Sequence, residues 1–264
     1  MKALKQKRLF LLDMDGTLYL GNRLFDSTLD FLQQIRKNGG RYLFLTNNSS
    51  KSVQSYVDKL AGLGIAATAE EFFTSSMATV LYLQDRYAGQ KVYVEGTESL
   101  RRELETHGIA TATSPEEDVT CLLAGYDTEL TYRKLEDACI LLNRGVDYIA
   151  THPDWVCPTE YGFAPDCGCV CEMLWRATGR HPAAVIGKPQ PAMAQLAMQR
   201  WGAAPEDTVM IGDRIYTDIA CGVNAGIDTV LVFSGETTPQ DWEESPIRPT
   251  YTAADVGEIL TCIR

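Results

Sequence analysis

Short apolar runs alternate with longer stretches of helical periodicity along the chain. The apolar runs favour buried strands, and they are 9–12, 41–45, 92–95, 120–124, 148–150, 184–186, 208–211 and 229–233. The helical stretches have apolar residues on one face, and they are 28–38, 52–63, 77–87, 98–107, 132–143, 170–178, 191–201 and 217–225. This alternation predicts an α/β fold with mainly parallel strands, a Rossmann-like doubly wound sheet.

Four polar clusters directly follow predicted strands. They are Asp13-Met14-Asp15-Gly16-Thr17, Thr46-Asn47-Asn48-Ser49-Ser50, Gly187-Lys188-Pro189 and Gly212-Asp213-Arg214. Ligands of open α/β sheets bind beyond the carboxyl ends of the strands. A single cluster would mean little, but the set of four predicts one site at that edge of the sheet.

The spacing of the clusters locates an inserted domain. The segments from Asp13 to Thr46 and from Lys188 to Asp213 each suit one helix and one strand. The segment from Thr46 to Lys188 is much longer than one crossover needs. We therefore predict a catalytic core at 1–80 and 182–264, with an α/β domain inserted at 81–181.

Asp13 and Asp15 predict a magnesium-dependent phosphoryl site. Two close carboxylates repel unless a cation lies between them, and Mg²⁺ prefers oxygen ligands, with Asp213 completing the set. A carboxylate can attack phosphorus, while a second acid protonates the leaving alcohol. The competing interpretations are a plain turn or a calcium loop. Met14, Thr17 and Leu18 do not supply the acids that a calcium loop needs.

The other clusters provide groups that can bind phosphate. Thr46 and Asn47 precede a predicted helix, whose N-terminus favours anions. Simple N-capping by Ser49, Ser50 or Ser52 is the alternative. Lys188 can neutralise charge on phosphate and on Asp13, although most lysines only solubilise a surface.

Gly212 and Asp213 begin a segment that reaches Asp218 five residues later. Asp218 either caps the following helix or holds a water that is bound to the metal, and the sequence leaves both open. We expect Gly212 and Asp218 to support the site.

Composition excludes several classes of protein. The chain has 264 residues, of which 45% are hydrophobic and 22% charged, and its net charge of −11 disfavours nucleic acid and anionic lipid as partners. No apolar run could span a membrane, and the apolar run after the basic start ends at Asp13, too early for a signal peptide. We expect a cytoplasmic protein with reduced cysteines. The alternate spacing of Cys167, Cys169 and Cys171 differs from that of a zinc knuckle.

The clusters together resemble the haloacid dehalogenase (HAD) superfamily of phosphatases. The motifs are D-x-D-G-T at 13–17, Thr46-Asn47-Asn48, Lys188 and G-D-x-x-x-x-D at 212–218. The NagD-like, or 4-nitrophenylphosphatase-like, branch is the most similar, through T-N-N-S-S-K-S at 46–52, G-K-P at 187–189 and P-x-x-x-G-x-x-P-D-C-G at 158–168.

This resemblance implies roles for the residues. Asp13 would be nucleophile and metal ligand, and Asp15 the acid/base with its backbone carbonyl on Mg²⁺. Thr46, Asn47 and Lys188 would bind phosphate, and Asp213 would be the remaining metal ligand. The inserted domain would be a C2-type cap that closes over the site and selects the substrate.

The segment 151–168 of the cap is the candidate for substrate specificity, because it is rich in proline, glycine and aromatic residues. Its candidate residues are His152, Asp154, Asp166 and Gly168. His152 is a candidate contact to substrate or phosphate, with a surface or structural histidine as at least an equal alternative, and it stands where the relatives often have asparagine. Trp155, Tyr161 and Phe163 either stack on an aromatic leaving group or are buried in the cap.

These observations predict a Mg²⁺-dependent phosphatase that hydrolyses small phosphate monoesters, such as sugar phosphates or nucleotides, through an aspartyl-phosphate on Asp13. The alternatives are a phosphotransferase or mutase with the same chemistry and a non-catalytic phosphate-binding module. The expected partner is a small phosphorylated metabolite, with the cap surface as a candidate homodimer contact.

Overall fold

The computed structural model describes residues 1–159 and 161–264, so Glu160, within the 158–168 pattern, lies outside the described residues. The chain forms two compact units. The core unit contains Met1–Thr46, Val57–Phe73 and Lys188–Arg264, and the inserted unit contains Asn47–Tyr56 and Thr74–Gly187. The predicted insertion at 81–181 lies within the inserted unit, whose role as a cap stays a prediction.

The core unit is built on a six-stranded sheet with the order β15-β14-β13-β1-β4-β5. Its strands are β1 (Leu9–Leu12), β4 (Arg41–Thr46), β5 (Phe72–Thr74), β13 (Thr208–Gly212), β14 (Asp228–Val232) and β15 (Tyr251–Ala253). Strand β1 pairs in parallel with both β4 and β13, and β13 and β14 continue the parallel order toward β15. The order of strands therefore reverses between β1 and β13, which is where open α/β sheets bind ligands.

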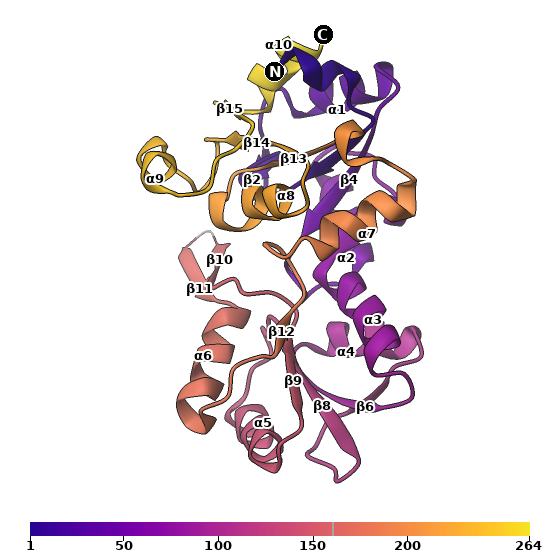
Figure 1. The fold of residues 1–264 in the computed structure, drawn as a ribbon, viewed down its shortest axis with the longest axis vertical. Helices are drawn as coiled ribbons and strands as arrows, with labels where there is room; N and C mark the ends of the chain where they lie inside the picture. Colours follow the sequence, from indigo (N-terminus) through magenta and orange to yellow (C-terminus); the bar gives the residue numbers. More distant parts are fainter. Residues whose placement is uncertain (160) are drawn as a thin grey trace. The chain divides into compact units, whose positions relative to one another are not determined.

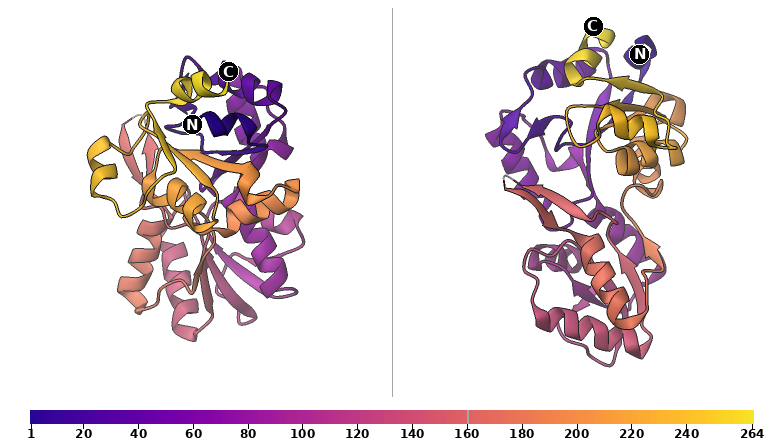
Figure 2. Two further views of the ribbon diagram at one scale, coloured as in Figure 1. Left: turned by 45° about the horizontal axis from the view of Figure 1, so that its top comes forward. Right: turned by 90° about the vertical axis from the view of Figure 1, so that its left-hand side faces the viewer.

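Helices accompany the core sheet and separate its strands along the chain (Figure 1). Helix α1 packs against α10, and α7 packs against α8 (Figure 2). Their bounds are α1 (Thr28–Lys37), α7 (Ala192–Trp201), α8 (Ala220–Asn224), α9 (Pro239–Glu244) and α10 (Val256–Ile263). The two chain termini meet in this unit, where the Lys5 ammonium donates to the Arg264 carbonyl at 2.6 Å.

Shorter elements complete the core unit. Helix α2 (Val53–Gly62) begins in the inserted unit and ends in the core unit. A hairpin of β2 (Tyr19–Leu20) and β3 (Arg23–Leu24) follows the first polar cluster, and a π-helix covers Ile215–Ile219. Short 3-10 helices lie at Lys2–Gln6, Ala69–Glu71 and Pro205–Asp207.

The inserted unit has its own five-stranded sheet with the order β12-β9-β8-β6-β7. Its strands, all paired in parallel, are β6 (Lys91–Glu95), β7 (Ala110–Ala112), β8 (Val119–Ala124), β9 (Asp147–Ala150) and β12 (Ala184–Val185). A separate antiparallel hairpin joins β10 (Val156–Thr159) to β11 (Gly162–Pro165).

Two hydrophobic clusters cover the two faces of this sheet, because successive strand residues point to opposite faces. Tyr93 and Leu122 belong to one cluster, and their neighbours Val94 and Cys121 to the other. The first cluster includes residues of α5 (Tyr132–Arg144) and α6 (Cys167–Thr178), and the second includes residues of α3 (Ser75–Arg86) and α4 (Glu98–Thr106). A domain boundary at residue 81 would fall inside α3.

The structure confirms the predicted α/β class, since parallel pairs of strands form most of both large sheets and helices lie between these strands along the chain. Among the described residues, every helix is too short or too polar to cross a membrane.

Candidate active site

Three side chains of the core unit meet at the carboxyl ends of its central strands. Asp13 follows β1, and the buried ammonium of Lys188 donates to its Oδ1 at 2.7 Å. The same ammonium donates to Asp218 Oδ1 at 2.6 Å and to the Leu45 carbonyl at 3.3 Å. Lys188 is therefore held by two carboxylates and the end of β4, and is not a surface lysine.

Asp213 follows β13 and is fixed by hydrogen bonds from the chain beyond β14. The Glu236 backbone N–H donates to its Oδ2 at 2.7 Å. Thr17 Oγ1 lies 3.5 Å from Asp213 Oδ1. A Cβ at Gly235 would lie only 2.0 Å from Asp213 Oδ2, so the backbone needs glycine to pass this close to the carboxylate.

Burial strongly affects the charges of this cluster. Burial first, and then the neighbouring Asp218 charge, hold the pKa of Asp13 well above its usual range, although Lys188 opposes the shift. The same two causes raise the pKa of Asp213 to about 7. Burial alone would lower the pKa of Lys188, but the charges of Asp13 and Asp218 outweigh it and raise that pKa. One ammonium therefore does not offset the full charge of these carboxylates, and their ionised forms are disfavoured unless another cation lies nearby.

The donor set of this cluster fits a divalent cation. Carboxylate oxygens of Asp13, Asp213 and Asp218 lie within 4.8 Å of one another. Hard oxygen ligands are the ones that Mg²⁺ and Ca²⁺ prefer, and an added cation would offset the excess negative charge. Each oxygen of Asp218 already has a donor, since Oδ1 accepts from Lys188 and Oδ2 from the Arg214 N–H.

Gly212 and Asp218 lie together, as expected of residues that support one site. A Cβ at Gly212 would lie 2.3 Å from the Asp218 Cβ, so this approach also requires glycine. Asp218 lies inside the π-helix, whose N-cap is Arg214, and is not the cap of a helix.

Asp15 is not part of this cluster. Its side chain is 47% exposed and forms an ion pair with Lys59 at 3.4 Å. The Lys59 ammonium also lies 4.1 Å from the centre of the Tyr19 ring. The acid/base role of Asp15 and its backbone contact to metal stay predictions.

Thr46 is the last residue of β4 and is buried, and Asn47 begins the inserted unit. Ser52 caps α2, because its Oγ accepts from the Ser55 N–H at 3.3 Å. The capping role and the predicted phosphate-binding role therefore belong to different residues. Asn47 Nδ2 donates to Asp154 Oδ1 at 2.9 Å within the inserted unit.

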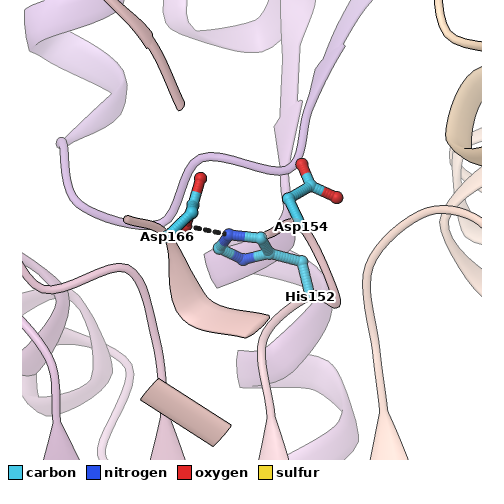
Figure 3. A group of neighbouring side chains, drawn as sticks. All are labelled: His152, Asp154 and Asp166. Carbon is cyan, nitrogen blue, oxygen red and sulfur yellow. Dashed lines mark hydrogen bonds and ion pairs between the residues drawn. The ribbon is translucent and has the colours of Figure 1, made fainter. Parts of the chain in front are cut away.

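The candidate specificity residues of the inserted unit lie together and are buried. His152 Nε2 and Asp166 Oδ1 are 2.8 Å apart, while the Asp154 carboxylate points away from the ring (Figure 3). His152 Nδ1 contacts Thr151 Oγ1 at 2.8 Å. Gly168 approaches the same loop so closely that a Cβ would lie 2.6 Å from the Pro153 carbonyl.

Neighbouring carboxylates favour the charged form of the buried His152 side chain. Burial opposes its charge, but the hydrogen bond to Asp166 and the charges of Asp166 and Asp154 raise its pKa. A ring nitrogen of His152 and carboxylate oxygens of Asp154 and Asp166 also lie within 4.8 Å of one another. The ring is held by its contacts to Asp166 and Thr151.

The aromatic side chains of this segment are not buried. Trp155 is 55% exposed, Tyr161 80% and Phe163 64%. Cys167 is buried, and Cys169 and Cys171 are partly buried, all as free thiols. In the described part of the chain, no group of three metal-ligating side chains includes a cysteine.

Sequence reasoning did not find Gly235 and Glu236, which shape and bind the Asp213 carboxylate. Both residues follow β14, and no sequence motif marks them. Glu236 binds the Asp213 carboxylate only through its backbone N–H, which any residue except proline would offer. A glycine after a predicted strand of the same sheet was the only signal available.

Comparison with known proteins is consistent with this geometry. A model described as haloacid dehalogenase-like hydrolase matches residues 10–110, and a HAD-hydrolase-like model matches residues 185–259. The 5'-nucleotidase YutF of Bacillus subtilis is 35% identical over 254 residues, which are 96% of this chain and 98% of that protein.

Two solved structures are also similar. A 4-nitrophenylphosphatase from Thermotoga maritima has 37% identity and a TM-score of 0.94, over 99% of both chains. A glycerol phosphate phosphatase from Mycobacterium tuberculosis, solved with magnesium, has 29% identity and a TM-score of 0.90, over 97% of this chain and 77% of that chain. The chain thus belongs to the haloacid dehalogenase-like hydrolases, among the phosphatases of the NagD and 4-nitrophenylphosphatase type.

Proposed function

We propose that this protein hydrolyses small phosphate monoesters through a covalent aspartyl-phosphate on Asp13, with Mg²⁺ as its cofactor. The observation that carries the proposal is the convergence of Asp13, Asp213, Asp218 and Lys188. A carboxylate nucleophile, oxygen ligands for a cation and a buried ammonium are the groups that phosphoryl transfer needs.

The side chains divide the reaction between them. An Asp13 oxygen attacks phosphorus, the bond to the leaving oxygen breaks, and Asp15 gives that oxygen a proton. Asp15 then takes a proton from water, whose oxygen attacks phosphorus and releases Asp13 and inorganic phosphate. Thr46, Asn47 and Lys188 bind the phosphate oxygens. Asp13, the Asp15 backbone carbonyl and Asp213 would hold Mg²⁺, which would neutralise charge on the phosphate.

The inserted unit acts in this proposal as the cap that selects the leaving group. A direct test is turnover of 4-nitrophenyl phosphate with Mg²⁺, followed by a panel of sugar phosphates, nucleoside monophosphates and glycerol phosphate ranked by kcat/KM. Transfer of the phosphoryl group to a second alcohol without release of phosphate would favour a phosphotransferase. No turnover by folded protein on any substrate would favour a non-catalytic binding module.

Removal of the cation is expected to stop the reaction. Treatment with excess chelator should lower the rate on 4-nitrophenyl phosphate by at least about 100-fold, because the buried carboxylates would then repel the anionic substrate. Readdition of Mg²⁺ should restore the rate, as followed by absorbance of the released nitrophenolate. A rate that the chelator leaves unchanged would contradict the role of the metal.

Gly235→Ala is expected to weaken cation binding more than folding. The added methyl would press on the Asp213 carboxylate, and Gly235 has no positive φ to strain the backbone. We expect the Mg²⁺ concentration for half-maximal activity to rise at least about 10-fold. Gly62→Ala is the matched control, because a Cβ there would meet no atom within 4 Å and should leave that concentration unchanged.

A further inference from the structure

Asn47 is held on three sides by other residues of the inserted unit. Its Nδ2 donates to Asp154 Oδ1 at 2.9 Å, and its backbone carbonyl accepts from Ser75 Oγ. Its Oδ1 lies so close to Gly187 that a Cβ there would be 2.6 Å away. The side chain that directly follows Thr46 therefore has its orientation set by its surroundings.

Asp154 is itself fixed in place. It is only 6% exposed, and its backbone carbonyl accepts from the Gly168 N–H at 2.8 Å, at the start of α6. The Thr151 N–H at the other end of the loop donates to the Ala124 carbonyl at 2.8 Å, which continues the pairing of β8 with β9. The carboxylate that contacts Asn47 is thus anchored to the sheet and to a helix.

The Asp154 carboxylate lies near the buried His152 ring. Burial opposes the charge of His152, but nearby acids raise its pKa. The largest of these effects are the hydrogen bond to Asp166 and the charge of Asp166, and the charge of Asp154 follows. A hydrogen bond to an ionised acceptor is stronger than one between neutral groups. A positive charge on His152 would therefore strengthen Asp154 as the acceptor for Asn47.

We propose that Asp154 is a positioning residue for phosphate binding, which acts by fixing the side-chain orientation of Asn47. This inference rests on the proposed function, in which Asn47 binds phosphate. It replaces the expectation that Asp154 selects the leaving group. Because phosphate is common to all substrates, loss of Asp154 should reduce the activity on every substrate by a similar factor.

The test is a double-mutant cycle on Asp154 and Asn47. D154A and N47A are each expected to lower kcat/KM by about 10- to 100-fold, the range for a hydrogen bond to a charged group. The double variant should be no slower than N47A, because Asp154 acts only through Asn47. D154N keeps an acceptor oxygen of the same shape and should remain within about 5-fold of the native enzyme.

D154A should lower kcat/KM by a similar factor for 4-nitrophenyl phosphate, for a sugar phosphate and for a nucleoside monophosphate. The inhibition constant of inorganic phosphate should rise in parallel, which reports phosphate binding without a leaving group. Glu117→Ala, which removes an exposed carboxylate of the same unit, is the matched control and should change none of these values. D154L is a second variant without an acceptor, since alanine leaves a cavity at this buried position.

Each outcome decides the matter. Multiplicative losses in the double variant, losses confined to one substrate class, or native activity of N47A would overturn the positioning role while the phosphatase function stands. A folded native protein that turns over no phosphate ester would overturn the proposed function, and this inference with it.

Discussion

Asp13→Asn is expected to lower kcat on 4-nitrophenyl phosphate by about four to six orders of magnitude, the range seen when a residue that covalent catalysis needs is removed. An amide oxygen is a much weaker nucleophile than a carboxylate, so the covalent step would fail. The shape of the side chain is kept, and its oxygen can still accept from Lys188. The fold should therefore survive, as circular dichroism and the melting temperature would show.

A matched control is Asp26→Asn, which makes the same change at an exposed aspartate of the core unit. It should retain native kcat. Rapid quenching of the native enzyme during turnover should also trap phosphate on the peptide that contains Asp13, and this label should be absent from D13N. Near-native kcat in D13N, with the asparagine verified by mass spectrometry, would rule out Asp13 as the nucleophile.

The central strands and their polar ends were predictable from the sequence because several signals agree there. The run Leu9–Leu12 is fully apolar, and the structure has a buried strand over the same residues. The predicted strands at 41–45 and 208–211 each extend one residue further. Such runs are buried on both sides in a parallel sheet, so hydrophobicity alone marks them.

Elements without such a signal were missed. Strands β5 and β15 have three residues each, too few for a pattern to show, and the hairpin β10–β11 carries exposed aromatic residues. The helix predicted at 217–225 is divided between a π-helix that ends at Ile219 and α8. The π-helix is only five residues long, about one turn, so its different period cannot show in the sequence.

In the candidate site, the sequence located the candidate residues after strands but predicted only some of the pairs that their side chains form. Lys188 was expected to neutralise Asp13, and the structure adds that it also binds Asp218. The contact between Asn47 and Asp154 joins residues far apart in the chain, and no local pattern encodes such a contact. Tertiary packing decides these pairs.

The buried carboxyl group of Glu95 is expected to have a large effect on how the stability of the protein depends on pH. It is the last residue of β6 and is 0% exposed, and neither carboxylate oxygen has a hydrogen-bond partner among the described residues. Burial, and then the charges of Asp127 and Asp137, raise its pKa from 4.5 to about 8, against the attraction of Lys134. Lys134 instead donates to Asp127 at 2.7 Å, so it compensates Glu95 only in part.

The sign of the pH dependence follows from this shift. Between pH 4.5 and about 8 the folded protein keeps a proton on Glu95 that the unfolded chain has lost. The contribution of protonated Glu95 to the free energy of unfolding is therefore complete below pH 4.5. It falls as the pH rises and is lost once the pH passes about 8. Each pH unit in that window costs about 1.4 kcal/mol, so the total loss is on the order of 5 kcal/mol.

Glu95→Gln should remove this loss, because glutamine has nearly the same shape and does not ionise. Urea unfolding at about pH 5, 7 and 9 should give similar stabilities for the two proteins at pH 5 and a growing advantage for E95Q above it. Hydrogen exchange in β6 and β8 would assign the change to the inserted unit. Glu117→Gln, at an exposed position, should follow the native protein throughout. Parallel curves for E95Q and the native protein would mean that Glu95 ionises near its ordinary pKa, so burial without a partner would not destabilise this carboxylate.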